Sequence, residues 1–232
     1  MDEVFKGATL LPVPVRSKAY EVLKDAIIRG SLRPGQRLIE SQLAELLNIS
    51  RTPLREAMLR LESEGFVQRL SSGGAQVKPL SAEEIRDLYA IRAVLEGLAV
   101  REAAERITDA QLERLAVLTR ELEAIEDGAD LEYIANLGEM FHLVILEASG
   151  SRQLAEHLRL LRDQIQRYRY LTIQVAGRGR AAAGEHTALL AVLRQRDPAQ
   201  AEQAMRQHVH QAWQSMMSRL REVDLGAEGA GR

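Results

Sequence analysis

Residues 50–56 of the chain read SRTPLRE, a stretch typical of the first turns of a helix. Ser50 is a favourable N-cap residue, and Pro53 falls in the first turn, where a helix tolerates proline. At about 100° per residue, the apolar residues of the predicted helix 51–64 fall on one face: Leu54, Ala57, Met58 and Leu61. Gly65 ends this helix. The pattern predicts an amphipathic helix that packs one face against a core.

The opposite face carries Arg51 and Arg55 one turn apart, with Thr52 beside them. Guanidinium groups at the start of an exposed helix suit the DNA major groove, because arginine bonds both the O6 and the N7 atoms of guanine. The N-terminus of a helix also favours phosphate. A solvated face without a ligand explains an isolated pair of arginines more readily, so the interpretation depends on the neighbouring segments.

The neighbouring segments follow the order of a winged helix-turn-helix. They are a helix from Ser17 that Gly30 ends, a turn at 32–35, an extended piece at 36–39, a short helix at 42–47 between Ser41 and Asn48, and strands at 66–70 and 76–80. The two strands flank a glycine-rich tip at 71–74, which is typical of a hairpin. Such a wing lets backbone approach the minor groove closely. With this order around the helix, DNA binding becomes the favoured interpretation.

Composition narrows the class of protein. The 232 residues are 46% hydrophobic, 28% charged and only 4% aromatic, which allows a buried core and favours helices over sheets. The chain has no cysteine, so disulfides, thiolate metal sites and cysteine nucleophiles are excluded. Apolar runs stay far below the roughly 18 residues of a membrane span, and residues 1–15 lack the layout of a signal peptide. We expect a soluble, cytoplasmic protein without a membrane partner.

The charge and the helical periodicity predict two domains in a mostly α protein. The net charge of −2 divides into +2 over residues 1–77 and −4 over the rest, so DNA contact needs a local cluster of cations. The predicted parts are a flexible arm at 1–15, a winged helix-turn-helix domain at 16–79, an antiparallel bundle of about six helices at 80–223 and a disordered tail at 224–232. The predicted bundle helices are 82–106, 108–126, 130–148, 151–175, 184–195 and 197–223.

Three histidines lie on apolar stripes of three different predicted helices: His142, His186 and His208. A single histidine on such a stripe is usually a hydrogen-bonded core residue. Three inward-facing imidazoles in one bundle also suit a divalent metal ion, zinc or nickel by ligand type. Spacing in the sequence leaves both interpretations open.

The N-terminal region resembles the GntR family of transcription regulators. The resemblance lies in residues 32–38 (LRPGQRL), 43–45 (LAE), 50–57 (SRTPLREA) and 61–67 (LESEGFV). It implies that Arg51, Thr52 and Arg55 occupy base- and phosphate-contacting positions. It also implies further backbone contacts at Ser41, Ser50, Ser72, Gly73 and Gly74. Ser41 departs from the arginine that fatty-acid-responsive members often carry there.

The C-terminal region resembles the FCD domain, the ligand-binding domain of the FadR-type subfamily. The matching stretches are 89–96 (YAIRAVLE), 141–142, 148–150, 185–186, 196–197 and 205–208. In metal-binding members the ligands are one Asp or Asn and three histidines, which here correspond to His142, His186 and His208. The acidic position is Gly138 in this chain, and Glu139 is one residue off the required face. Either three histidines bind the metal alone, or they bond an acidic ligand without metal.

Arg92 is expected to point into the same cavity as the histidines. A guanidinium there suits a small carboxylate effector, because the two groups pair through two hydrogen bonds. An ordinary ion pair between Arg92 and Glu96, four residues on, is the alternative. Residues 167–170 (RYRY) are compatible with pocket groups or with a solvated face, and the sequence assigns neither.

These observations favour a homodimeric, ligand-responsive transcription regulator that binds a palindromic operator in double-stranded DNA. The family implies a repressor that its effector releases. One alternative is a metalloenzyme with a three-histidine site, for which Glu139 and Glu185 are the candidate bases, although no HExxH motif occurs. Another is a helical interaction protein whose N-terminal module no longer binds DNA.

Overall fold

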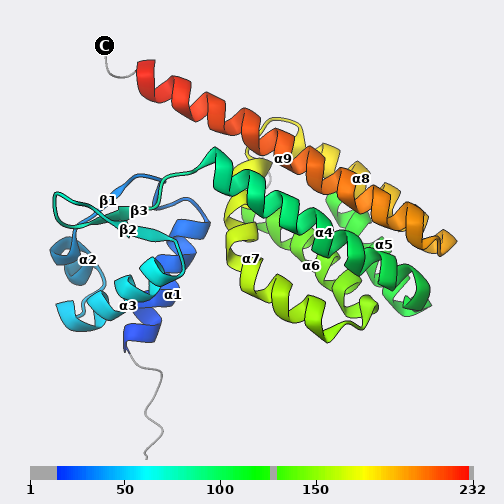
Figure 1. Cartoon of the computed structure of the whole chain (residues 1–232), viewed down its shortest axis with the longest axis horizontal. Coiled ribbons are helices and arrows are strands. Elements are labelled where there is room, and N and C mark those ends of the chain that lie inside the picture. Colours follow the sequence, from blue (N-terminus) through cyan, green and yellow to red (C-terminus); the bar gives the residue numbers. More distant parts are fainter. Residues whose placement is uncertain (1–14, 126–129, 230–232) are drawn as a thin grey trace, which may run out of the picture. The chain divides into compact units, whose positions relative to one another are not determined.

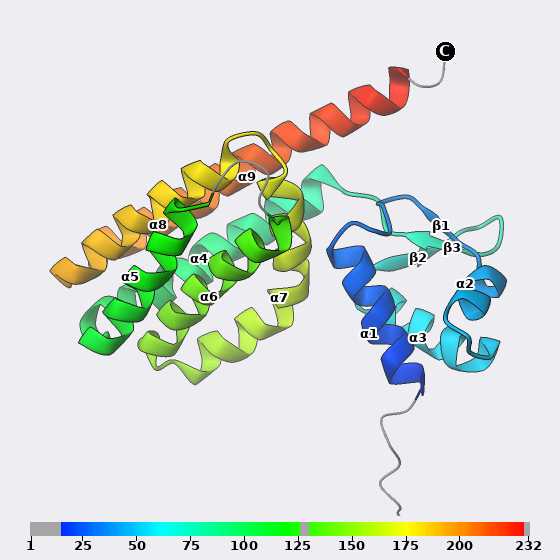
Figure 2. The same ribbon diagram turned by 180° about the vertical axis from the view of Figure 1, so that it is seen from behind.

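The computed structural model describes residues 15–125 and 130–229. The chain divides into two compact units, Met1–Pro79 and Leu80–Arg232. Within the described ranges, nine helices accompany a single three-stranded sheet (Figures 1 and 2). The predicted fold class, a winged helix-turn-helix with a helical bundle, is confirmed. Apart from Val15, which begins the first helix, the predicted arm at 1–15 lies outside the described residues.

The N-terminal unit combines three helices with the small antiparallel sheet. Its elements are α1 (Val15–Ile28), β1 (Arg37–Leu38), α2 (Glu40–Leu46), α3 (Arg51–Ser63), β2 (Val67–Arg69) and β3 (Ala75–Val77). The strand order is β1–β3–β2, and Val67 lies opposite Val77. The apolar face of α3 packs against α1, which buries Tyr20, Leu54 and Leu61 completely. This packing leaves the other face of α3 to solvent.

Helix α2 begins earlier than the sequence pattern predicts. Ile39 is its N-cap residue, and Ser41, expected to open the helix, lies inside the first turn. Glu40 takes the first helical position, where a carboxylate is favourable beside the positive end of the helix dipole. Asn48 follows the helix with a φ of +51°, in agreement with its predicted closing role.

The second unit is a bundle of six helices. They are α4 (Ala82–Arg106), α5 (Asp109–Glu123), α6 (Leu131–Ser149), α7 (Arg152–Ile173), α8 (Arg178–Gln195) and α9 (Pro198–Gly229). Helix α4 packs along α6 and α9, and α5 packs against α6 and α8 (Figures 1 and 2). The core includes Phe141, Ile145 and Leu189, each at most 1% exposed. None of the described helices has the length and apolar character needed to cross a bilayer.

Two helices of the bundle are longer than predicted. Helix α8 begins at Arg178 and not at residue 184, because Gly177 alone makes the break, at a φ of +75°, and Gly179 lies within the first turn. Helix α9 continues to Gly229, into the predicted tail at 224–232. No proline follows Pro198 in the sequence to stop it. Residues 230–232 of that predicted tail lie outside the described part of the chain.

Candidate functional site

The beginning of α3 presents its polar residues to solvent. Arg51, Thr52 and Arg55 are exposed, while the apolar face of the same helix is buried at Leu54, Ala57, Met58 and Leu61. Among the residues that the structure describes, Arg51 forms no ion pair or hydrogen bond. Its guanidinium therefore keeps all its donors for a ligand.

Arg55 is held by a residue that the sequence analysis did not single out. Its Nε atom lies 2.7 Å from Oε2 of Glu40, in the first turn of α2. The Arg55 side chain is 64% exposed, and exposed ion pairs contribute only about 0–1 kcal/mol. The contact thus orients the guanidinium at little cost to its exchange for a base or a phosphate. A carboxylate at the start of α2 with an arginine in α3 is the signal that could have found it.

The two predicted serines differ in their placement. Ser50 is the N-cap residue of α3, as predicted, but its side chain makes no capping hydrogen bond. Its exposed hydroxyl remains available beside the helix N-terminus. Ser41 is exposed in the first turn of α2. Both positions are accessible to a phosphate backbone.

The wing tip is exposed at Ser72, Gly73 and Gly74. Both glycines have a φ of +88°, a conformation that other residues rarely adopt, so the tip depends on glycine. The Nη2 atom of Arg37, in β1, donates to the carbonyl oxygen of Gly73 at 3.4 Å. Sequence reasoning placed no function on Arg37, yet the structure adds its cation to the wing.

In the second unit, helices α6, α8 and α9 bring His142, His186 and His208 together. One nitrogen from each ring lies within 4.8 Å of the others. The ring centroids of His186 and His208 are 4.8 Å apart, and Phe141 stacks on His186 with its centroid at 4.4 Å. The three imidazoles that the sequence placed on separate stripes therefore form one cluster.

Two ion pairs flank the histidine cluster, the partly buried Arg178–Glu185 and the buried Arg92–Glu96. Glu185 accepts from Nδ1 of His208 at 2.6 Å and pairs with Arg178 through two bonds of 2.6 and 2.9 Å. On the other side, Oε2 of Glu96 lies 3.1 Å from Nδ1 of His142. Arg178 is buried because α8 starts earlier than predicted, which explains why the sequence missed it. The hydrogen bond to Glu185 fixes the Nδ1 side of His208, whereas Nδ1 of His142 lies near Glu96 without a hydrogen bond in the described structure.

The imidazoles are neutral at physiological pH. Burial lowers the pKa of His142 to about 4, although the neighbouring Glu96 raises it. Burial, followed by His208, lowers the pKa of His186 well below its usual range. Burial raises the pKa of Glu96, but Arg92 and His142 together hold it well below the usual range. Neutral imidazole is the form that binds a metal ion.

The position that an acidic ligand would occupy faces the cluster but carries no side chain. A Cβ atom at Gly138 would lie 3.8 Å from Cε1 of His186, in ordinary contact. Glu139 is turned away and binds Arg162 and Gln166. Both ring nitrogens of His186 are buried without a hydrogen-bond partner in the described structure. An unsatisfied imidazole among three neutral rings fits a divalent metal ion.

Arg92 lines the cavity beside the histidines and also pairs with Glu96. It is 3% exposed and lines a small cavity of about 50 Å³ together with Gly138 and the three histidines. Its Nε atom also donates to Oε1 of Glu96 at 3.0 Å, the predicted ion pair. Arg169 lines the same cavity, although the sequence left residues 167–170 without a role.

Comparison with known proteins identifies the family of this chain. The model for bacterial regulatory proteins of the gntR family matches residues 15–77, and the FCD domain model matches residues 87–211. The HTH-type transcriptional regulator YdhC of Bacillus subtilis (strain 168) is 32% identical over 202 residues, which cover 85% of this chain and 87% of YdhC. The repressor GlaR of Escherichia coli (strain K12) is 32% identical over 203 residues, 82% of this chain and 90% of GlaR.

Among solved structures, E. coli McbR/YncC is similar to this chain with a TM-score of 0.72 at 26% identity, covering 90% of this chain and 100% of that one. The winged helix-turn-helix and the helical domain therefore define a DNA-binding transcription regulator. The chain belongs to the GntR family and carries an FCD domain. Both domains and these relatives are those of transcriptional regulators and not of enzymes, which excludes the metalloenzyme alternative.

Proposed function

We propose that the chain is a homodimeric repressor that acts in the cytoplasm, binds a palindromic operator, and is released by a small carboxylate bound in its FCD domain. One observation carries this proposal. Arg51 is exposed at the N-terminus of α3 and has no partner among the described residues, and the other unit encloses a cavity lined by arginines and neutral histidines. The relative GlaR, which is named a repressor, supports the direction of regulation.

In this proposal, α3 enters the major groove. Arg51 and Arg55 contact bases or phosphates, and Thr52 contacts the adjacent backbone. Ser41 and Ser50 add phosphate contacts near the two helix N-termini. The wing tip at Ser72, Gly73 and Gly74 approaches the neighbouring backbone, with Arg37 as an additional cation beside it.

Dimerisation is supported by an apolar stripe on α4. Ile91, Val94 and Leu98 lie on one face of the helix and are 47%, 52% and 39% exposed. Spacings of three and four residues place them on one side of the helix. A second copy of this chain covers the stripe by the same surface, as two-fold symmetry requires.

Binding of the effector in this cavity is coupled to binding of DNA by the other unit. His142, His186 and His208 would hold zinc or nickel, which would supply a Lewis-acidic centre for a carboxylate oxygen. Arg92 would bind the same ligand while Glu96 keeps its position. Effector and operator then alter each other's affinity by the same factor.

Fluorescence anisotropy with the DNA upstream of the gene tests the DNA-binding assignment. Removal of the Arg51 side chain in Arg51→Ala should weaken specific binding by about 1–3 kcal/mol, which is a base contact's usual worth. Arg86→Ala is the matched control, because Arg86 is equally exposed but lies on α4. Binding that is unchanged in the double variant Arg51→Ala and Arg55→Ala would favour the interaction-protein alternative.

A further inference from the structure

A second cavity adjoins the histidine cluster. It measures about 320 Å³ and lies among α4, α6, α7 and α9. His142 and Arg169 line both this cavity and the smaller one around the histidines. Protein interiors contain few voids larger than a water molecule, and about 300 Å³ is already the size of a small-molecule site. The volume is therefore too large to be a packing defect.

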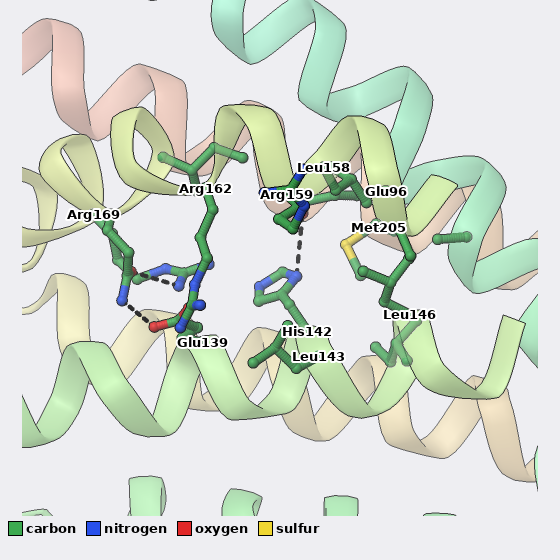
Figure 3. A pocket seen from close by; sticks show the side chains of 15 residues that line it. Glu96, Glu139, His142, Leu143, Leu146, Leu158, Arg159, Arg162, Arg169 and Met205 are labelled. Carbon is green, nitrogen blue, oxygen red and sulfur yellow. Dashed lines mark hydrogen bonds and ion pairs between the residues drawn. The ribbon is translucent and has the colours of Figure 1, made fainter. Parts of the chain in front are cut away.

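The cavity is charged at one end and mostly apolar elsewhere, apart from Glu96 and Arg159. Figure 3 shows Arg162, Arg169 and Glu139 gathered at one end, with Leu146 and Met205 at the other and His142 between them. The apolar lining is completed by Ala99, Leu143, Ile145, Ala155, Leu158 and Ile165. A ligand that matches this lining has one charged group and an apolar body.

Arg169 supplies the charge that selects the ligand. Burial, followed by the Arg92 guanidinium, lowers its pKa to about 10, so it is still a cation at neutral pH. Its Nη1 atom donates to Gln166 at 2.8 Å, but within the described structure no carboxylate pairs with it. The nearest candidates are already engaged, since Glu139 binds Arg162 and Gln166, and Glu96 binds Arg92. A half-buried cation without a paired anion favours the binding of an anionic ligand.

The side chains that line the cavity have a net positive charge, like Arg169 itself. Three arginines and two glutamates line the cavity, and His142 is neutral above about pH 4. One of those glutamates, Glu96, is neutralised by Arg92 from outside the cavity. The excess is positive, which suits an anionic ligand.

We propose that the effector is an amphipathic monocarboxylate of medium chain length, with its carboxylate on Arg169 and its hydrocarbon chain between α6 and α7. This inference rests on the proposed function, because it specifies the carboxylate expected in the FCD domain. His142 forms the boundary between this cavity and the histidine cluster, so a bound chain contacts the cluster from its open side.

Isothermal titration calorimetry of the full-length chain with butanoate, hexanoate and octanoate tests the proposal. Affinity should rise about fourfold for each methylene, because each one leaves water for an apolar lining. Arg169→Met should weaken octanoate binding at least about tenfold. Arg152→Met should change it less than about threefold, because Arg152 is an exposed arginine of α7 that does not line the cavity. The melting temperature of each variant verifies folding.

A second variant protects the test if Arg169→Met fails to fold. Ala155→Phe fills the apolar end and should abolish the dependence on chain length while butanoate still binds. The inference would be overturned if affinity did not depend on chain length but rose from butanoate to succinate or citrate. That result would still support a carboxylate effector. The absence of any binding by these five acids would also overturn it. The weakening of operator binding in Arg51→Ala tests the proposed DNA-binding function separately, because that measurement uses none of the five acids.

Discussion

Burial keeps three titratable side chains of the histidine cluster in the form that a ligand needs. His142 and His208 each face a carboxylate on one nitrogen, at 3.1 and 2.6 Å. Their pKa values nevertheless fall, because burial outweighs the attraction of the carboxylates. His186 has no such carboxylate and stacks on Phe141. The residue that a metal site in this family would add, an acid at position 138, is the one that this chain lacks.

The substitution Gly138→Asp should restore a fourth ligand. The new Cβ has only ordinary contacts, the nearest at 3.8 Å, so the carboxylate fits beside His186. We expect zinc affinity to rise at least about tenfold, because four-coordinate sites with a carboxylate satisfy the ion better. Competition with a chromogenic chelator measures the change. Gly184→Asp, on the exposed face of α8 with open space around it, is the control and should leave the affinity unchanged.

Glu185, the carboxylate beside His208, should affect metal binding through that histidine. Glu185 accepts from Nδ1, which fixes the tautomer and leaves Nε2 as the nitrogen with a free lone pair. Glu185→Gln should therefore lower zinc affinity about tenfold, the lower end of the usual loss for such partners. Glu123→Gln, at an exposed position of α5, is the control and should leave zinc affinity unchanged. An unaltered zinc affinity in Glu185→Gln would show that His208 needs no such support.

At the scale of elements, the starting points of helices decide which residues reach a site. Because α2 begins at Glu40, its carboxylate reaches Arg55 of α3. Because α8 begins at Arg178, a buried guanidinium reaches Glu185 one to two turns later in the same helix. Sequence patterns locate helices well, but their first residues depend on caps and on tertiary contacts.

Helix α4 carries an apolar stripe that the packing of its own unit leaves uncovered. Val94, at the centre of the stripe, is 52% exposed. The substitution Val94→Asp should dissociate the proposed dimer, because a carboxylate would be buried twice across a symmetric interface. Sedimentation velocity at several protein concentrations distinguishes monomer from dimer. Ser218→Asp, an exposed position on α9, should leave the dimer intact; a dimeric Val94→Asp would place the interface elsewhere.

At the scale of the whole molecule, the free energy of unfolding should decrease as pH falls. The folded-state pKa of His142 is about 4, against about 6.5 in the unfolded chain. Between these values the unfolded state binds more protons, so unfolding becomes easier as pH falls. The lowered pKa values of Glu96 and Glu185 act in the same direction, since their stabilisation is also lost on acidification.

Urea unfolding of chelator-treated protein between pH 7 and pH 4 measures this effect. The free energy of unfolding should fall, with about 3 kcal/mol from His142 alone. His142→Gln should show a shallower dependence on pH, because it lacks the buried group that protonates on unfolding. His157→Gln replaces an exposed histidine and should keep the full dependence. A profile that is flat from pH 6.5 to 4 would contradict the burial of a neutral imidazole.

The order of helices and strands, the exposed arginines of α3 and the inward faces of three histidine-bearing helices were determined by local patterns. Helical periodicity decides which side of each helix is buried, and that much is written in a few neighbouring residues. Convergence of the histidines, the Arg55–Glu40 contact, the early start of α8 and the cavity beside Arg169 were decided only by tertiary structure. Each joins segments far apart in the chain or depends on the packing of several helices at once, and such distances have no signature in sequence spacing.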